Sequence, residues 1–230
     1  MSDGQTFRGV KEGGIVNFRG IPFAEPPVGN LRWKAPRLKT FYPNPVDATS
    51  FGYNCATLQT VDDPQVQDQS EDCLHLNIQV AEWVLKNKRK LPAVAYIHGG
   101  AFGFGNNRDD LTSLVSQGLV SFNINYRLGP YGFLHLPETE VGEKFRGNWG
   151  LLDQRAALEW ISIYGGVFGA DKDSIVLDGC SAGSQSTWHH ITSQHSWPYF
   201  HRAVTTGIGM SSGIYYEGEK TDVSLRVIIQ

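Results

Sequence analysis

The feature that most constrains this chain is Gly179-Cys180-Ser181-Ala182-Gly183, a G-x-S-x-G pentapeptide that joins two different local patterns. The apolar run at 174–177 predicts a strand before it, and the polar pattern at 182–192 predicts a helix after it. A strand that turns sharply into a helix needs small residues two positions either side of the serine, and it leaves Ser181 strained and exposed. The helix start would also place free N–H groups and partial positive charge near the serine oxygen. The alternative is a plain strand-to-helix turn in which Ser181 only caps the helix.

Strand and helix patterns alternate along the rest of the chain. Near-continuous apolar runs are typical of strands covered on both faces in a parallel sheet, and a period of 3.6 predicts a helix. The predicted elements are a hairpin of strands at 6–10 and 15–19, strands at 74–80, 91–97, 119–125 and 202–206, and a helix that begins after Asn148 and ends at Gly165-Gly166. We therefore predict an α/β fold with a central, mostly parallel sheet and antiparallel strands at its N-terminal end. No repeat or linker divides residues 1–230, so we expect one domain, incomplete at its C-terminal end.

A second glycine-rich turn, His98-Gly99-Gly100-Ala101, follows the predicted strand at 91–97. In α/β-hydrolases an HGGG-type loop at this place supplies part of the oxyanion hole, because small residues let backbone N–H groups reach a developing oxyanion. Losing one such donor typically lowers the rate about 10²–10³-fold. The alternative is a glycine-rich surface turn. A dinucleotide-binding loop fits poorly, because Gly100, Gly103 and Gly105 read G-x-x-G-x-G and not G-x-G-x-x-G.

The composition of the chain argues against several classes of function. The formal net charge is −3, and the one basic run, at 86–90, is typical of a solvated loop, so we expect no nucleic-acid partner. No stretch approaches the roughly 20 apolar residues of a membrane span, and residues 1–12 do not form a signal peptide. The three cysteines lack C-x-x-C spacing and no H-E-x-x-H occurs, so we predict no metal site and no cofactor.

Longer blocks flank these two motifs. They are F-R-G-I-P-F-A-E-P-P-V-G at 18–29, E-D-C-L-H-L-N at 71–77, N-Y-R-L-G-P-Y-G-F at 125–133, N-W-G-L-L-D-Q at 148–154 and F-G-A-D at 168–171. In this order they resemble the type-B carboxylesterase family, the carboxylesterase and cholinesterase group of the α/β-hydrolases. The resemblance runs from about residue 7 to 207 and implies the N-terminal part of the family domain. Residues 214–230 diverge from it, although 223–229 has a β-rich pattern.

The resemblance implies a carboxylic ester hydrolase that acts on a small-molecule ester through an acyl-enzyme. Ser181 would be the nucleophile, and the backbone N–H groups of Gly100, Ala101 and Ala182 would form the oxyanion hole. Gly99, Gly179 and Gly183 would shape the two turns.

The resemblance also implies a disulfide between Cys55 and Cys73, which match the family's first pair. A loop of the size of residues 56–72 corresponds to about 3 kcal/mol of stabilisation in the chain-entropy model. The alternative is two free buried thiols. A disulfide implies an oxidising compartment, so we expect a secreted or secretory-pathway protein when the chain is full length.

Two departures bear on substrate and chemistry. Cys180 stands where the family usually has Glu, which removes a negative charge beside the site and weakens stabilisation of an imidazolium. Cholinesterases of the family carry a Trp between the first two cysteines, where its ring holds a quaternary ammonium. Residues 56–72 contain no aromatic residue, which argues against a choline ester.

A third departure concerns the catalytic triad, which in this fold runs Ser, then Asp or Glu, then His. No acidic residue lies between Ser181 and any of the later histidines, which are His189, His190, His195 and His201. We expect His189 and His190 on a helix surface. The family's acid and histidine are therefore expected beyond residue 230, and this chain alone is expected to be inactive.

One alternative is a non-catalytic, cholinesterase-like binding or adhesion module of the same fold. Retention of Ser181 and of the oxyanion loop favours the esterase, because adhesion needs neither. An unrelated α/β binding protein would have to reproduce the ordered blocks by chance.

Overall fold

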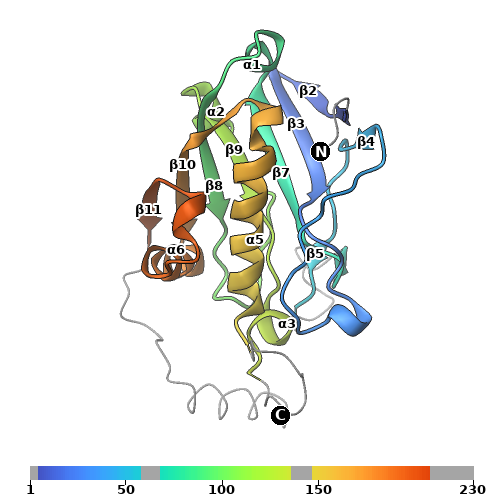
Figure 1. The fold of residues 1–230 in the computed structure, drawn as a ribbon, viewed down its shortest axis with the longest axis vertical. Coiled ribbons are helices and arrows are strands. Elements are labelled where there is room, and N and C mark those ends of the chain that lie inside the picture. Colours follow the sequence, from blue (N-terminus) through green and yellow to red (C-terminus); the bar gives the residue numbers. More distant parts are fainter. Residues whose placement is uncertain (1–4, 58–67, 136–146, 208–230) are drawn as a thin grey trace.

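The structure is a computed structural model that describes residues 5–57, 68–135 and 147–207 (Figure 1). Its centre is a seven-stranded sheet in the order β11-β10-β8-β9-β7-β3-β2. These strands are β2 (Val10–Glu12), β3 (Ile15–Pro22), β7 (His75–Ala81), β8 (Leu91–Ile97), β9 (Val120–Ile124), β10 (Ala170–Cys180) and β11 (Arg202–Thr206). The strands β11, β10, β8 and β9 are parallel to one another, whereas β7 pairs antiparallel with β9, β3 with β7, and β2 with β3. This arrangement confirms the predicted fold class.

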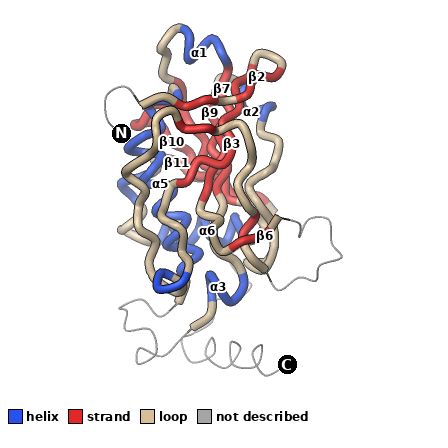
Figure 2. Tube along the Cα trace, turned by 90° about the vertical axis from the view of Figure 1, so that its right-hand side faces the viewer, coloured by secondary structure: helices blue, strands red, loops and turns tan. Residues whose placement is uncertain are grey.

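Helices flank the sheet on both sides. They are α1 (Glu82–Lys86), α2 (Thr112–Ser116), α3 (Gly129–Phe133), α5 (Trp149–Tyr164) and α6 (Ala182–Thr192), with 3₁₀ turns η1 (Gly29–Leu31), η3 (Gly165–Phe168) and η4 (Trp197–Tyr199). The long helix α5 crosses one face, and the short α2 lies on the opposite side (Figures 1 and 2). Within the described residues no helix is long and apolar enough to cross a membrane.

The apolar face of the sheet forms the core against α5. Because side chains alternate along a strand, every second residue of the central strands points to this face. They include Ala93, Ala95, Ile97, Phe122, Ile175 and Leu177, all fully buried. Trp160 and Ile161 of α5 belong to the same cluster. The predicted helix is therefore present, and it begins at Trp149, directly after Asn148 as expected.

The second face of the sheet is polar where the sequence pattern predicted a covered apolar strand. Cross-strand register places Asp178, Tyr96, Asn123 and Asn77 in one row over β10, β8, β9 and β7. All five residues of β9 are buried, so the strand is covered on both sides as expected. Asn123 nevertheless faces the second side, so that side has side-chain amide groups that can form hydrogen bonds.

The predicted hairpin is only partly correct. The hairpin consists of β2 and β3, which pair with Val10 opposite Asn17. The first part of the predicted strand, β1 (Phe7–Arg8), leaves the hairpin and pairs in parallel with β4 (Val46–Asp47). Gly9 lies between the two pieces, and no side chain fits there because a Cβ would lie 2.7 Å from the Asn17 carbonyl oxygen.

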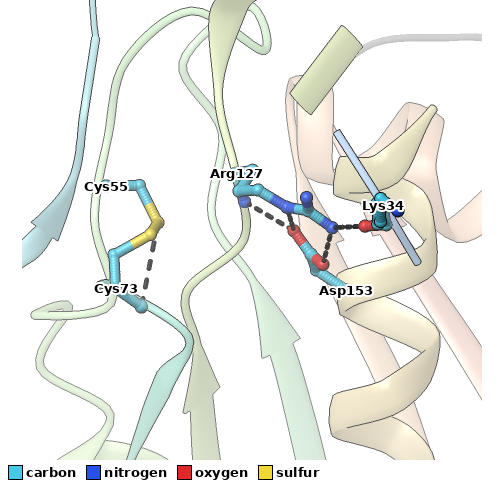
Figure 3. A network of polar contacts seen from close by, with 5 residues as sticks. All are labelled: Lys34, Cys55, Cys73, Arg127 and Asp153. Atoms are coloured by element: carbon cyan, nitrogen blue, oxygen red, sulfur yellow. Dashed lines mark hydrogen bonds and ion pairs between the residues drawn. A yellow bond between two sulfur atoms is a disulfide. The ribbon is translucent and has the colours of Figure 1, made fainter. Parts of the chain in front are cut away.

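A buried ion pair fixes α5 to the loop after β9 (Figure 3). Arg127 Nε and Nη2 donate to the two carboxylate oxygens of Asp153 at 2.8 and 2.7 Å. The Arg127 backbone N–H also donates to Asp153 Oδ2, and Nη2 donates to the Lys34 carbonyl at 2.8 Å. Both side chains are almost completely buried, so each charge is stabilised by its partner and not by water.

Cys55 and Cys73 form a disulfide, which confirms the pairing that the resemblance implied (Figure 3). Cys55 lies on β5 (Asn54–Cys55), which pairs in parallel with β6 (Gln69–Ser70). Both sulfur-bearing residues are buried beside the start of β7. The predicted β-rich segment at 223–229 lies outside the described residues.

Replacing Asp153 with Asn should lower the free energy of unfolding by about 3–5 kcal/mol, because the Arg127 charge would stay buried without its partner. Urea unfolding followed by circular dichroism measures this change. The matched control is Asp173→Asn, which removes an ion pair with Lys172 that is largely exposed and should shift the unfolding midpoint little. A loss below about 1 kcal/mol for Asp153→Asn would show that the pair does not hold α5.

Candidate active site

Ser181 lies in a strained turn between β10 and α6. Its backbone angles are φ 56° and ψ −118°, a region that L-residues rarely adopt. The Ser181 N–H donates to the Thr206 carbonyl of β11 at 2.9 Å, and the Ser181 carbonyl accepts from Gln185 of α6. The neighbouring strand and the helix therefore hold the strained backbone in place.

Two glycines allow this turn by close backbone contact. A Cβ on Gly179 would lie 2.1 Å from the Gly183 carbonyl oxygen, and a Cβ on Gly183 would lie 2.0 Å from the Ile97 carbonyl oxygen. No side chain fits at either position. The structure thus gives a steric reason for the glycine spacing of the pentapeptide, and it brings the start of α6 against the end of β8.

The loop after β8 lies directly against Ser181. A Cβ on Gly99 would be 3.0 Å from the Ser181 Cβ. Gly100, Ala101 and Phe102 follow with φ of 110°, 50° and 59°, so three consecutive residues have positive φ. The Gly100 carbonyl accepts hydrogen bonds from the N–H groups of residues 103 and 104, which closes the loop into a tight turn.

Three backbone N–H groups of the two glycine-rich turns have no backbone acceptor in the described structure. Among the described residues, the backbone N–H groups of Gly100, Ala101 and Ala182 donate to no backbone acceptor. The Ser181 hydroxyl likewise has no hydrogen-bond partner in this part of the chain. Ala182 is the first residue of α6, so its N–H points out of the helix end as an unsatisfied donor. The loop that contains Gly100 and Ala101 reaches Ser181 through the contact of Gly99.

His98 packs against Tyr126 and contacts the backbone of the loop after β8, a role that the sequence pattern did not reveal. Its imidazole is buried and stacks on Tyr126, with 4.5 Å between ring centroids. Its Nδ1 lies 2.7 Å from the Gly99 carbonyl oxygen, and the Tyr126 hydroxyl donates to the His98 carbonyl at 3.0 Å. Burial lowers the pKa of His98 to about 4, so the ring is neutral at pH 7.

His190 corrects the expectation of a helix-surface residue, whereas His189 is exposed as expected. His190 is buried, with Nε2 3.1 Å from Gln154 Oε1 of α5 and Nδ1 2.9 Å from Ser196 Oγ. Gln154 Nε2 in turn donates to Ser186 Oγ at 3.0 Å. The helical period did not reveal this network, because a histidine that faces a neighbouring helix has the same spacing as an exposed one.

Cys180 is the free cysteine of the described residues. Side chains alternate along β10, so Cys180 lies on the same sheet face as Asp178. Burial raises the pKa of Asp178, and that of Tyr96 beside it to about 12. No group of three or more His, Cys, Asp or Glu residues in the described part of the chain could hold a metal ion.

A mostly parallel sheet with a strained serine between a strand and a helix defines an α/β-hydrolase fold. The sequence profile of the carboxylesterase family matches residues 3–223. The chain therefore belongs to the carboxylesterase family. It is 40% identical over 186 residues to the para-nitrobenzyl esterase of Bacillus subtilis (strain 168), which covers 78% of this chain and 37% of that protein.

Solved structures agree with this assignment. The carboxylesterase EST55 of Geobacillus stearothermophilus superposes with a TM-score of 0.85 at 32% identity, covering 97% of this chain and 46% of that one. The juvenile hormone esterase of Manduca sexta, with OTFP covalently attached, gives a TM-score of 0.83 at 32% identity, covering 94% and 41%. The chain thus spans less than half the length of the relatives it matches.

The buried histidines should make stability depend on pH. The pKa of His190 is lowered to about 3 by burial and by the nearby His189 and Arg155. In the unfolded chain the imidazole is protonated below about pH 6.5, whereas in the folded chain it stays neutral down to about pH 3. The contribution of His190 to the free energy of unfolding is therefore fully present above about pH 6.5 and decreases as the pH falls. For His190 we expect a loss of about 2 kcal/mol between pH 7 and pH 5.

Urea unfolding at both pH values tests this for wild type and His190→Gln. The difference between the two pH values should shrink by about 2 kcal/mol in the variant. The exposed His195 provides the control, because His195→Asn should leave the wild-type difference intact. An unchanged pH difference in His190→Gln would contradict a neutral buried ring.

Proposed function

We propose that this chain carries the nucleophile and the oxyanion-binding groups of a serine esterase that hydrolyses small-molecule carboxylic esters through an acyl-enzyme. The observation that carries the proposal is the geometry at Ser181. A strained serine with an unbonded hydroxyl lies against the Gly99 turn, and the N–H groups of Gly100, Ala101 and Ala182 have no backbone acceptor. Strain and unsatisfied donors of this kind are typical of sites that hold charge in a transition state.

The chemistry would proceed in two steps. The Ser181 oxygen attacks the ester carbonyl carbon, the hydroxyl proton passes to a base, and the carbonyl oxygen becomes an oxyanion held by the three N–H groups. The carbon–oxygen bond to the alcohol then breaks, the alcohol leaves with that proton, and an acyl-serine remains. Water attacks the acyl-serine by the same route and releases the carboxylic acid.

The general base comes, in this proposal, from residues outside this sequence. His98 and His190 are buried and have other hydrogen-bond partners. No Asp or Glu lies between Ser181 and His201 to complete a triad in the order of this fold. The relatives are more than twice as long, which leaves room for an acid and a histidine in the complete protein. Without them the loss in rate is about 10⁶-fold, so the 230-residue chain should turn over esters negligibly.

Two further features narrow the proposal. Residues 56–72 lack an aromatic ring for a quaternary ammonium, so we propose an uncharged alcohol group and not a choline ester. The Cys55–Cys73 disulfide supports folding in an oxidising compartment, as in secreted proteins. The proposed acyl-enzyme requires a covalent bond to the protein, and the related juvenile hormone esterase has OTFP covalently attached.

A fluorophosphonate probe tests the reactive serine in the protein as it occurs in its source. We expect labelling at Ser181, loss of labelling in Ser181→Ala, and retention in Cys180→Ser, which separates the hydroxyl from the neighbouring thiol. Mass spectrometry of the labelled peptide locates the adduct. Absence of any adduct at Ser181 in the natural protein would reject the esterase and favour a binding module. The isolated 230-residue chain and its Ser181→Ala variant should hydrolyse p-nitrophenyl acetate equally slowly.

A further inference from the structure

A basic turn at one end of the molecule has no role in the proposed active site. The run Lys86-Asn87-Lys88-Arg89-Lys90 leads from α1 into β8, and all five of its residues are exposed, as expected for a solvated loop. It lies where β8 begins, beside the first residue of β10, because Leu91 pairs with Ala170. Ser181 follows the other end of β10, whose 11 residues span roughly 30 Å. The turn and the serine are therefore at opposite ends of the sheet (Figure 1).

Hydrogen bonds give the basic turn a fixed shape. The backbone N–H groups of residues 87–89 donate to carbonyls of α1 at 3.0, 3.2 and 2.9 Å. Lys90 Nζ donates to the Gly166 carbonyl of η3. A Cβ on Gly169 would lie 3.3 Å from the Arg89 carbonyl oxygen, so the backbone after η3 also packs on the turn. The turn therefore presents its side chains from an ordered support that includes η3.

The three cations at 88–90 form no ion pair with a carboxylate in the described part of the chain. The carboxylate of α1, Glu82, is already shared by Lys11 at 2.8 Å and Lys86 at 2.9 Å. The other charged side chains near this end are Asp171, the pair Lys172–Asp173 and the pair Glu12–Arg19. The three unpaired cations therefore outweigh the one unpaired carboxylate, and this end of the molecule attracts negative charge.

Exposed apolar side chains flank the basic turn. Trp83 of α1 is 49% exposed, and Val167 of η3 and Ile163 in the last turn of α5 are 52% and 54% exposed. A single exposed apolar residue is ordinary on a protein surface, but three beside unpaired cations form a mixed apolar and basic surface. Tryptophan is enriched at the headgroup level of membranes, and lysine and arginine are attracted to anionic lipids. The combination is typical of proteins that lie on a membrane surface.

We propose that this basic end, made up of residues 83, 88–90, 163 and 167, docks on a membrane surface that contains anionic lipid. The cations at 88–90 would contact lipid phosphates, and Trp83 would insert at the level of the headgroups. A soluble polyanion would use the cations alone and leave the three apolar side chains exposed, so the mixed surface favours a membrane. Docking through this end leaves Ser181 facing away from the lipid. The proposal therefore goes beyond the esterase activity and does not depend on it.

Co-sedimentation of the full 230-residue chain with lipid vesicles tests the proposal. We expect binding to vesicles of phosphatidylserine and phosphatidylcholine mixed at about one to two. Binding to phosphatidylcholine alone should be at least tenfold weaker, because neutral vesicles do not attract the cations. Raising the salt concentration from about 0.1 M to about 1 M should also weaken binding at least tenfold, since it shortens the Debye length from about 10 Å to about 3 Å. These comparisons use the unaltered chain, so they do not depend on the folding of a variant.

Variants then assign the surface that binds. The test variant carries three substitutions, Lys88→Gln, Arg89→Gln and Lys90→Gln. The matched control removes the same charge from exposed positions elsewhere, through Arg37→Gln, Arg108→Gln and Arg202→Gln. The test variant should bind the anionic vesicles at least tenfold more weakly with an unchanged circular dichroism spectrum, whereas the control should bind like wild type. Trp83→Ala should also weaken binding, because it removes the apolar anchor.

Equal binding to neutral vesicles, full binding by the test variant, or an equal loss in the control would overturn the proposal. Binding to heparin but not to the anionic vesicles would assign a soluble polyanion to this end and would overturn it as well. Attachment through an apolar face of the sheet would not depend on the cations at 88–90, so the same variants distinguish it. Ser181→Ala should bind vesicles like wild type, and failed labelling at Ser181 therefore leaves this proposal untouched.

Discussion

The contact between Gly183 and the carbonyl of Ile97 determines where the two turns of the proposed active site meet. It places the first turn of α6 on the end of β8, at a distance that only a glycine permits. The loop that continues from β8 then runs beside Ser181, so the two glycine-rich motifs come together although they are far apart in sequence. A larger residue at 183 would separate α6 from β8, and Ser181 from the loop that carries the proposed oxyanion donors.

Two successive residues of α5 hold this arrangement from opposite sides. Asp153 binds Arg127 in the loop after β9, and Gln154 binds His190 on α6. Both are fully buried, so α5 connects the strand side and the helix side of the site through polar contacts inside an apolar core. Such contacts fix the rotation of α5 about its axis as well as stabilising it, because only one rotation lets both side chains reach their partners. The helix is therefore oriented by the polar side chains of Asp153 and Gln154 and packed by its aromatic residues.

The sequence was sufficient for the fold class and for the order of the elements, and less so for the contacts between them. The glycine spacing around Ser181 has a steric reason that is visible in the sequence, and the predicted strands at 91–97 and 202–206 match the bounds of β8 and β11. Burial of His190 was not visible, because it depends on a partner helix 36 residues away. The polar face of β9 was missed because its alternation is hidden inside an apolar run. Each failure concerns tertiary partners that a local pattern cannot contain.

The hydrogen bond from Ser181 to Thr206 has a mechanical consequence. Residues of β11 are exposed along the whole strand, and in the described residues β11 forms the edge of the sheet. An edge strand offers free backbone groups to any strand that pairs with it. One further strand would thus be coupled to the serine backbone through a single intervening strand. The backbone geometry of Ser181, the proposed nucleophile, would therefore change when a further strand pairs with β11.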